Sequence, residues 1–128
     1  MGRPIFDEAR IHPAIRGKIA EWRTEIVKEV QDVVAAKDLV VVGMKMNPFP
    51  RKARKLLDAA GIEYTYLEYG SYLSGYRSRL PLKLWTGWQT FPMVFVRGVL
   101  IGGASEVAKL LQSGELKQRL EAGAGREA

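Results

Sequence analysis

Residues 47–50, Asn-Pro-Phe-Pro, stand at a corner of the chain where many enzymes place a reactive side chain. They follow an apolar run over residues 39–42 and precede a basic, leucine-containing segment that is typical of a helix. The free N–H groups at a helix N-terminus favour negative charge, so a cysteine at such a corner has a lowered pKa and becomes a nucleophile. This chain contains no cysteine, and an asparagine amide cannot attack a disulfide. We therefore interpret Asn47 as a helix cap and predict no catalytic residue.

The residue inventory also removes several kinds of metal and redox chemistry. Without cysteine there is no disulfide, no thiolate nucleophile and no thiolate-bound metal centre. The single histidine, His12, cannot build a metal site from one chain, and the proline after it favours a helix entry or a surface position. We expect no metal, no required cofactor and no thiol–disulfide oxidoreductase activity, and enzymatic activity of another kind stays open.

The charge of the chain favours anionic partners. Its formal net charge is +6 over 128 residues, and a basic domain attracts acidic molecules, nucleic acid among them. The sequence shows no base-reading motif and its basic residues are spread over several predicted elements, so we do not expect nucleic acid to be the partner. The longest apolar run is about five residues, against roughly 20 needed to span a bilayer. With no secretory signal at the start, we expect a cytoplasmic protein without a membrane partner.

Hydrophobic spacing predicts the elements of the first half of the chain. Apolar residues at spacings of three and four predict a long helix over 13–36, on which Trp22 would anchor any partner surface. Residues 39–43, LVVVG, are typical of a strand buried on both faces. A helix from about residue 48 to 60 follows, and residues 62–70 alternate like a second strand.

The second half predicts a helix, a hairpin and a helical end. Residues 71–87 favour a helix that Pro81 would break or restart. Residues 93–103 predict a hairpin of two apolar runs around Arg97-Gly98, followed by helices that end near Leu120. A strand–helix–strand crossover and then a hairpin predict an α/β fold, with a four-stranded mixed sheet flanked by helices.

Two motifs in this order of elements resemble the glutaredoxin family, which has a thioredoxin-like fold. Residues 87–107, GWQTFPMVFVRGVLIGGASEV, are similar to the family's Thr-Phe-Pro, hairpin and Gly-Gly pair. The Gly-Trp before Thr-Phe-Pro is closest to the monothiol branch, which carries Cys-Gly-Phe-Ser at its first helix. In that register Asn47 takes the place of the nucleophilic cysteine, and Phe49 matches the motif's phenylalanine. The resemblance covers about residues 25–120 and implies the fold without the thiol chemistry.

The resemblance also implies a groove for glutathione or an extended γ-glutamyl peptide. In the family the proline after Thr-Phe is cis, and we expect the same of Pro92, so that the backbone before it can pair with the peptide. Lys45 matches a basic residue that pairs with the glycyl carboxylate, and Ser105 and Glu106 stand where the family contacts the γ-glutamyl end. The paired glycines allow close approach to a helix start, which attracts a carboxylate. The implied binding residues are Lys45, Asn47, Phe49, Thr90, Phe91, Pro92, Gly102, Gly103, Ser105 and Glu106.

Each of these features also has a purely structural interpretation. Thioredoxin-like folds keep the cis-proline even where nothing binds. The basic residues over 45–55 fit a solvated helix face, and Trp85 and Trp88 fit internal packing. A binding role for the groove and a role in maintaining the fold are therefore both open.

The expected organisation gives a second hypothesis about function. We expect a helical extension over 1–37, packed on the domain or projecting from it, a glutaredoxin-like domain over 38–120, and a flexible tail over 121–128. The amphipathic helix over 13–36 would then serve as a protein-interaction or homodimer surface, independently of any ligand in the groove.

Overall fold

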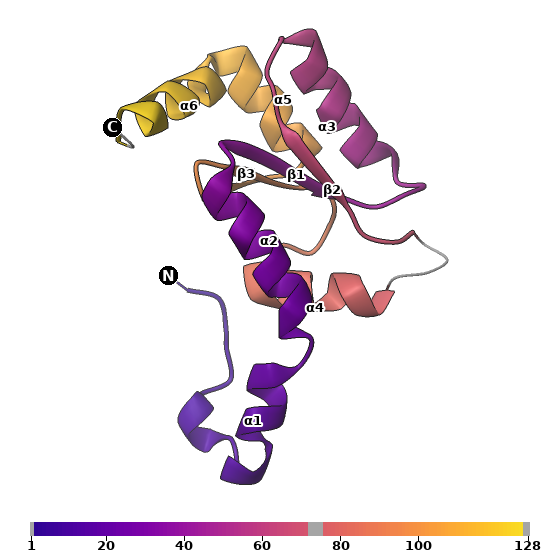
Figure 1. Ribbon diagram of the computed structural model, residues 1–128, viewed down its shortest axis with the longest axis vertical. Helices are drawn as coiled ribbons and strands as arrows, with labels where there is room; N and C mark the ends of the chain where they lie inside the picture. The colour runs from indigo at the N-terminus through magenta and orange to yellow at the C-terminus, as the bar shows by residue number, and fades with distance from the viewer. Residues whose placement is uncertain (1, 72–75, 127–128) are drawn as a thin grey trace.

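A four-stranded mixed sheet forms the centre of the molecule (Figure 1), in a computed structural model that describes residues 2–71 and 76–126. Its order is β2-β1-β3-β4, and β1 runs parallel to β2 and antiparallel to β3, which pairs antiparallel with β4. The predicted four-stranded mixed sheet is therefore confirmed. The strands are β1 (Leu39–Gly43), β2 (Thr65–Glu68), β3 (Met93–Val96) and β4 (Val99–Gly102).

Helices cover both faces of this sheet. Helices α2 and α4 lie on one face, and α3, α5 and α6 lie on the other (Figure 1). A short 3₁₀ turn, η1, and helix α1 stand apart from the sheet. The bounds are η1 (Glu8–Arg10), α1 (Pro13–Glu21), α2 (Thr24–Ala36), α3 (Pro48–Ala59), α4 (Tyr76–Thr86), α5 (Ala104–Ser113) and α6 (Glu115–Arg126).

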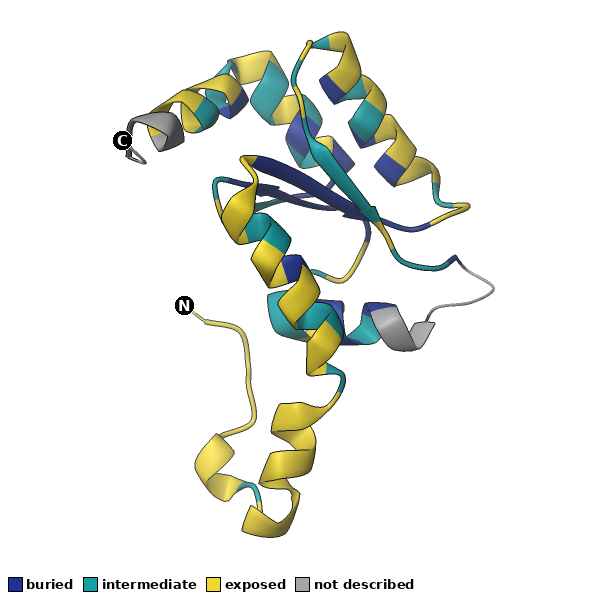
Figure 2. Ribbon diagram, viewed as in Figure 1, coloured by how far each residue is buried: buried dark blue, intermediate teal, exposed yellow. Residues whose placement is uncertain are grey.

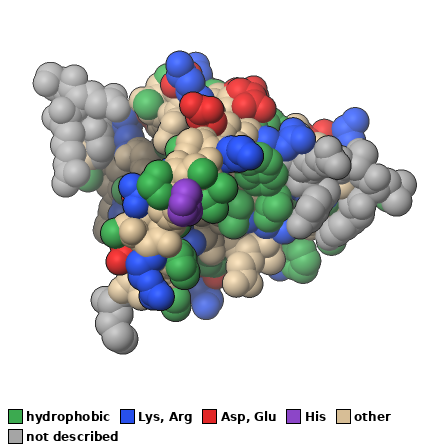
Figure 3. Space-filling view, turned by 90° about the horizontal axis from the view of Figure 1, so that it is seen from below, with side chains coloured by type: hydrophobic (Ala, Val, Ile, Leu, Met, Phe, Trp, Pro, Cys, Tyr) green, Lys and Arg blue, Asp and Glu red, His purple; other side chains and the backbone are tan. Residues whose placement is uncertain are grey.

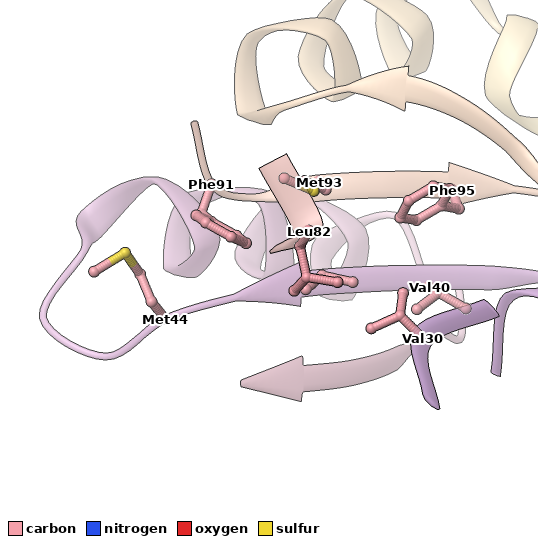
Figure 4. Close-up of a cluster of buried hydrophobic side chains, with 8 residues drawn as sticks. Val30, Val40, Met44, Leu82, Phe91, Met93 and Phe95 are labelled. Carbon is pink, nitrogen blue, oxygen red and sulfur yellow. The ribbon is translucent and has the colours of Figure 1, made fainter. Parts of the chain in front are cut away.

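Strand β1 divides the hydrophobic core because its side chains alternate between the two faces. Leu39 and Val41 belong to the cluster under α3, α5 and α6. Val40 belongs to the other cluster, where Val30 of α2 and Leu82 of α4 reach it (Figure 4). Every residue of β1 is buried, which confirms the predicted strand with two covered faces.

The predicted long helix over 13–36 is wrong in one respect, because the structure divides it into α1 and α2. The break lies at Trp22 and Arg23, where Trp22 is extended and Arg23 adopts a left-handed conformation with φ 50° and ψ 37°. Neither glycine nor proline marks this point, and left-handed backbone is uncommon for arginine. The guanidinium of Arg23 lies 5.9 Å from the centre of the Trp22 ring, so a cation–π contact accompanies the turn.

The break separates an exposed N-terminal lobe, residues 2–23, from the rest of the molecule. Helix α1 has no buried residue, whereas α2 contributes Val30 to the core. The lobe projects away from the sheet and is coloured almost entirely as exposed (Figure 2). The predicted extension over 1–37 therefore contains two parts, because α2 packs on the sheet whereas residues 2–23 project from it.

The remaining helices differ from the predictions at their ends. Pro81 does not break α4 but lies inside it; Pro81 and Leu82 are both buried, so packing outweighs the intrinsic cost of proline there. Residues 72–75 of the predicted helix lie outside the described residues. The last helix does not end near Leu120, because α6 continues to Arg126, into the segment predicted as a flexible tail.

Candidate functional site: a groove between two helix starts

Seven of the ten predicted binding residues line a single groove of about 320 Å³. The groove lies where the start of α3, the loop before β3 and the start of α5 meet. It is at the lower end of the size range of small-molecule sites in proteins, roughly 300–1,000 Å³. The lining residues are Phe49, Trp88, Thr90, Phe91, Pro92, Gly103, Ala104, Ser105 and Glu106.

The loop before β3 presents backbone to the groove and packs its side chain inward. The Phe91–Pro92 peptide bond is cis. The Phe91 ring is buried in the core at 3% exposure, so the part of Phe91 that can meet a ligand is its backbone. Within the described part of the chain the Phe91 N–H has no hydrogen-bond partner, so it can donate to a ligand.

Asn47 joins the start of α3 to this loop. Its Oδ1 accepts the N–H of Phe49 at 3.0 Å, which is the predicted helix cap and is confirmed. Its Nδ2 donates to the carbonyl oxygen of Phe91 at 3.4 Å. Both ends of the amide are therefore engaged within the protein. At the position that the resemblance assigns to a nucleophile, this chain has a structural bridge that also occupies the Phe91 carbonyl.

The start of α5 offers backbone donors to the groove. Val107 makes the first backbone hydrogen bond of this helix, to the carbonyl of Gly103 at 3.0 Å. The N–H groups of Ala104 and Ser105 precede it, so they can bind an acceptor, and the helix dipole favours an anionic one. The carboxylate of Glu106 turns back and accepts the Gly103 N–H at 2.8 Å.

Gly102 does not line the groove, but its lack of a side chain leaves room for Glu106 to take this position. Its φ is +120°, a conformation that other residues rarely adopt. A Cβ on Gly102 would lie 2.6 Å from Cγ of Glu106, which is too close for any real contact. Any other residue at position 102 would be strained at this φ, and its Cβ would clash with the Glu106 side chain.

Lys45 does not join the groove-lining residues. Its backbone N–H donates to the carbonyl of Gly70 at 2.7 Å, which ties this loop residue to the chain after β2, and Lys45 itself is exposed. Its predicted role toward a glycyl carboxylate stays a prediction that the groove geometry does not support. Asn47 and Gly102 stand beside the lining as supporting residues.

Trp88 and Ala104 line the groove but were not among the predicted site residues. The packing interpretation fits Trp85, which stacks on Phe95 with ring centroids 6.0 Å apart. Packing alone does not describe Trp88, because this residue packs against the core and also lines the groove. Its indole N–H is buried and has no hydrogen-bond partner in the described residues. Its position two residues before Thr90 was the available sequence signal.

The basic face of α3 lies outside this groove. Arg54 places its guanidinium 4.0 Å from the centre of the Tyr66 ring, whereas Arg51, Lys52 and Lys55 are exposed. Burial, with a hydrogen bond to a neighbouring carboxylate, raises the pKa of Tyr66 to about 12. None of these basic residues is among those that line the groove.

Neither a metal site nor a membrane span emerges from the described residues. Over 2–71 and 76–126, no three His, Asp or Glu side chains gather closely enough to hold a metal ion. In the same ranges no helix combines the length and apolar character needed to cross a bilayer.

Comparison with known proteins identifies the family. The family model described as glutaredoxin matches residues 39–101. A glutaredoxin-like protein of Dictyostelium discoideum is 42% identical over 98 residues, which cover 77% of this chain and 80% of that relative. The chain belongs to the glutaredoxin family. A probable monothiol glutaredoxin of Legionella pneumophila is 33% identical to this family member over 72 residues, covering 56% of this chain and 78% of the relative.

Solved glutaredoxin structures share the fold of this family member. A mutated buckwheat glutaredoxin has a TM-score of 0.71 and 28% identity, covering 81% of this chain and 94% of its own. A complex of buckwheat glutaredoxin with glutathione has a TM-score of 0.69 and 25% identity over the same shares. The thioredoxin-like fold predicted from the motifs is therefore confirmed.

Proposed function

We propose that this glutaredoxin-family protein binds glutathione, or an extended γ-glutamyl peptide, in the groove and performs no thiol redox chemistry. The observation that carries the proposal is the convergence of seven predicted binding residues on one groove. The buckwheat relative, whose structure is a glutathione complex, supports it. Without a cysteine, binding in this groove is non-covalent.

The two polar ends of a γ-glutamyl ligand find complementary groups at α5. A carboxylate accepts hydrogen bonds from the N–H groups of Ala104 and Ser105 at the positive end of the helix dipole. An ammonium group pairs with the carboxylate of Glu106, which lines the groove. The Phe91 N–H then donates to a carbonyl in the middle of the extended ligand. The family resemblance implies this orientation, with the cysteinyl part against Phe91.

A blocking substitution with a matched control tests this proposal. Ser105 is exposed at the groove edge and Gln112 is exposed on the same helix outside the groove. Calorimetry with S-methylglutathione should show saturable binding to the natural chain and to Gln112→Trp, and a loss of at least about tenfold for Ser105→Trp. Equal affinity of all three proteins, or no saturable binding to any, would refute a ligand site in this groove.

The cytoplasmic location predicted from the sequence belongs to the same proposal, and cell fractionation tests it.

The exposed N-terminal lobe favours a second candidate function, an interaction surface. Three large apolar side chains on α1 and its end are 44–55% exposed: Ile15, Ile19 and Trp22. Seen from the end of the lobe, hydrophobic side chains gather beside the histidine (Figure 3). We propose a homodimer or protein contact there.

Deletion of the lobe at the observed break tests this candidate. Because α2 and the sheet form the core without residues 2–23, a chain starting at Thr24 should keep its fold. Analytical ultracentrifugation should then show self-association of the full chain and none of the shortened chain. A full chain that stays monomeric across the concentration range excludes the homodimer.

A further inference from the structure

The two helix starts that face the groove differ in what they offer to a ligand. The first three residues of α3 are Pro48, Phe49 and Pro50. The prolines have no N–H, and the Phe49 N–H is bonded to Asn47. This end therefore presents no free backbone donor from its first three residues. The start of α5, by contrast, presents donors that bind an anion.

A free thiolate therefore has little to stabilise it near α3. Helix N–H groups are what lower the pKa of a sulfur at such a corner, and here they are absent or occupied. The oxygen of Asn47 accepts from Phe49 and one N–H of its nitrogen donates to Phe91, so a single side-chain N–H stays available at this corner. A neutral thioether sulfur needs no such donor, so this end of the groove can accommodate it.

The same end carries exposed apolar side chains. Phe49 lines the groove and yet is 57% exposed. Met46, which precedes Asn47 in the same corner, is 67% exposed and has a φ of +66°. Aromatic and methionine side chains adapt well to varied apolar ligands. Since the groove holds only about 320 Å³, a group attached to the ligand's sulfur would extend outward past Phe49.

We propose that the preferred ligand is an S-alkyl or S-aryl derivative of glutathione and not the free thiol. Its γ-glutamyl end lies at α5, its sulfur lies beside Asn47, and its S-substituent covers Phe49 and Met46. No covalent bond forms or breaks. This inference rests on the proposed function, because it assigns the ligand class of the same groove.

The test compares three probes: reduced glutathione, S-methylglutathione and S-hexylglutathione. We expect S-hexylglutathione to bind the full chain at least about tenfold more tightly than S-methylglutathione, equivalent to about 1.4 kcal/mol. Reduced glutathione should bind no more tightly than the S-methyl derivative. Calorimetry gives all three affinities under identical conditions.

Substitutions locate the S-substituent. Phe49→Ala and Met46→Asn should each reduce the ratio of S-hexyl to S-methyl affinity, and asparagine tolerates the positive φ of Met46. Val99→Ala is the matched control, since Val99 is a 48% exposed apolar residue at the hairpin and outside the groove. It should leave the ratio unchanged.

The outcomes separate this inference from the proposed function. Equal binding of all three probes keeps the groove as a glutathione site and overturns the preference for S-substituted ligands. A hexyl preference that survives both Phe49→Ala and Met46→Asn also overturns it, because the chain would then bind elsewhere. Failure of all three probes to bind overturns the proposed function itself.

Discussion

Replacement of Asn47 by alanine or serine separates the two hydrogen bonds of its side chain. Alanine removes both the cap on the Phe49 N–H at 3.0 Å and the bridge to the Phe91 carbonyl at 3.4 Å. Serine keeps an oxygen that can cap the helix but has no donor that reaches Phe91. The pair therefore compares loss of the bridge alone with loss of cap and bridge together.

The magnitudes follow from the two bonds. Loss of an N-cap costs about 1 kcal/mol. The bridge to Phe91 is long and partly exposed, so its contribution lies at the low end of the range for a neutral hydrogen bond, about 0.5 kcal/mol. We expect Asn47→Ala to lower the free energy of unfolding by about 1.5 kcal/mol and Asn47→Ser by about 0.5 kcal/mol.

Urea denaturation followed by circular dichroism measures both values, provided that the m-value stays constant. The serine variant should also bind S-methylglutathione more tightly, by about two- to tenfold, because the Phe91 carbonyl becomes available to the ligand. An alanine variant as stable as the natural chain would refute the bridge. A serine variant as stable as the natural chain would do the same, because serine removes the bridge. A serine variant that loses as much stability as alanine would instead refute the cap, because the cap would then contribute nothing.

Three further substitutions test other parts of the account. Gly102→Ala should destabilise the fold by about 1–3 kcal/mol, because of the positive φ at this position and the clash with Glu106. Gly17→Ala is the control and should not destabilise the fold, because the space around Gly17 is open. Thermal unfolding measures both variants. The raised pKa of Tyr66, about 12 against 10 in the unfolded chain, means that its stabilising contribution is complete below pH 10 and is lost between pH 10 and 12. Tyr66→Phe should therefore lose less stability than the natural chain over that window, and parallel losses would contradict the shift. Asn47→Cys removes the amide that occupies the Phe49 N–H, so this N–H becomes free to stabilise the new thiolate. The variant should attack oxidised glutathione, forming a mixed disulfide and releasing one reduced glutathione, faster than the exposed control Gln112→Cys, as measured by mass spectrometry. Equal rates would show that more than the sulfur is missing.

The start of α3 and the hairpin were predictable because their signals are local. Asn47 followed by proline specifies a cap and a first helical residue, and both appear as predicted. Arg97 and Gly98 both have positive φ, as a two-residue hairpin turn requires. Such short-range features depend on the residues themselves and little on the rest of the fold.

Two features could not be predicted from local signals. They are the helix break at Trp22 and Arg23, and the exact set of residues that line the groove. An apolar stripe continues across the break, and only packing determines that α2 lies on the sheet while α1 does not. The family resemblance implied Lys45 as a binding residue, but the hydrogen bond of its N–H to Gly70 depends on how two loops meet. Trp88 serves both the core side and the groove, which its residue type alone does not reveal.

The central claim is that the groove binds a γ-glutamyl ligand without a thiol of its own. Heteronuclear NMR titration with S-methylglutathione tests it most directly, because the amide signals of Phe91, Ala104 and Ser105 report on the groups proposed to contact the ligand. The account predicts saturable shifts at these amides in the millimolar range or below, with no change in protein mass after dialysis. Shifts confined to other parts of the chain, or none that saturate, would contradict it.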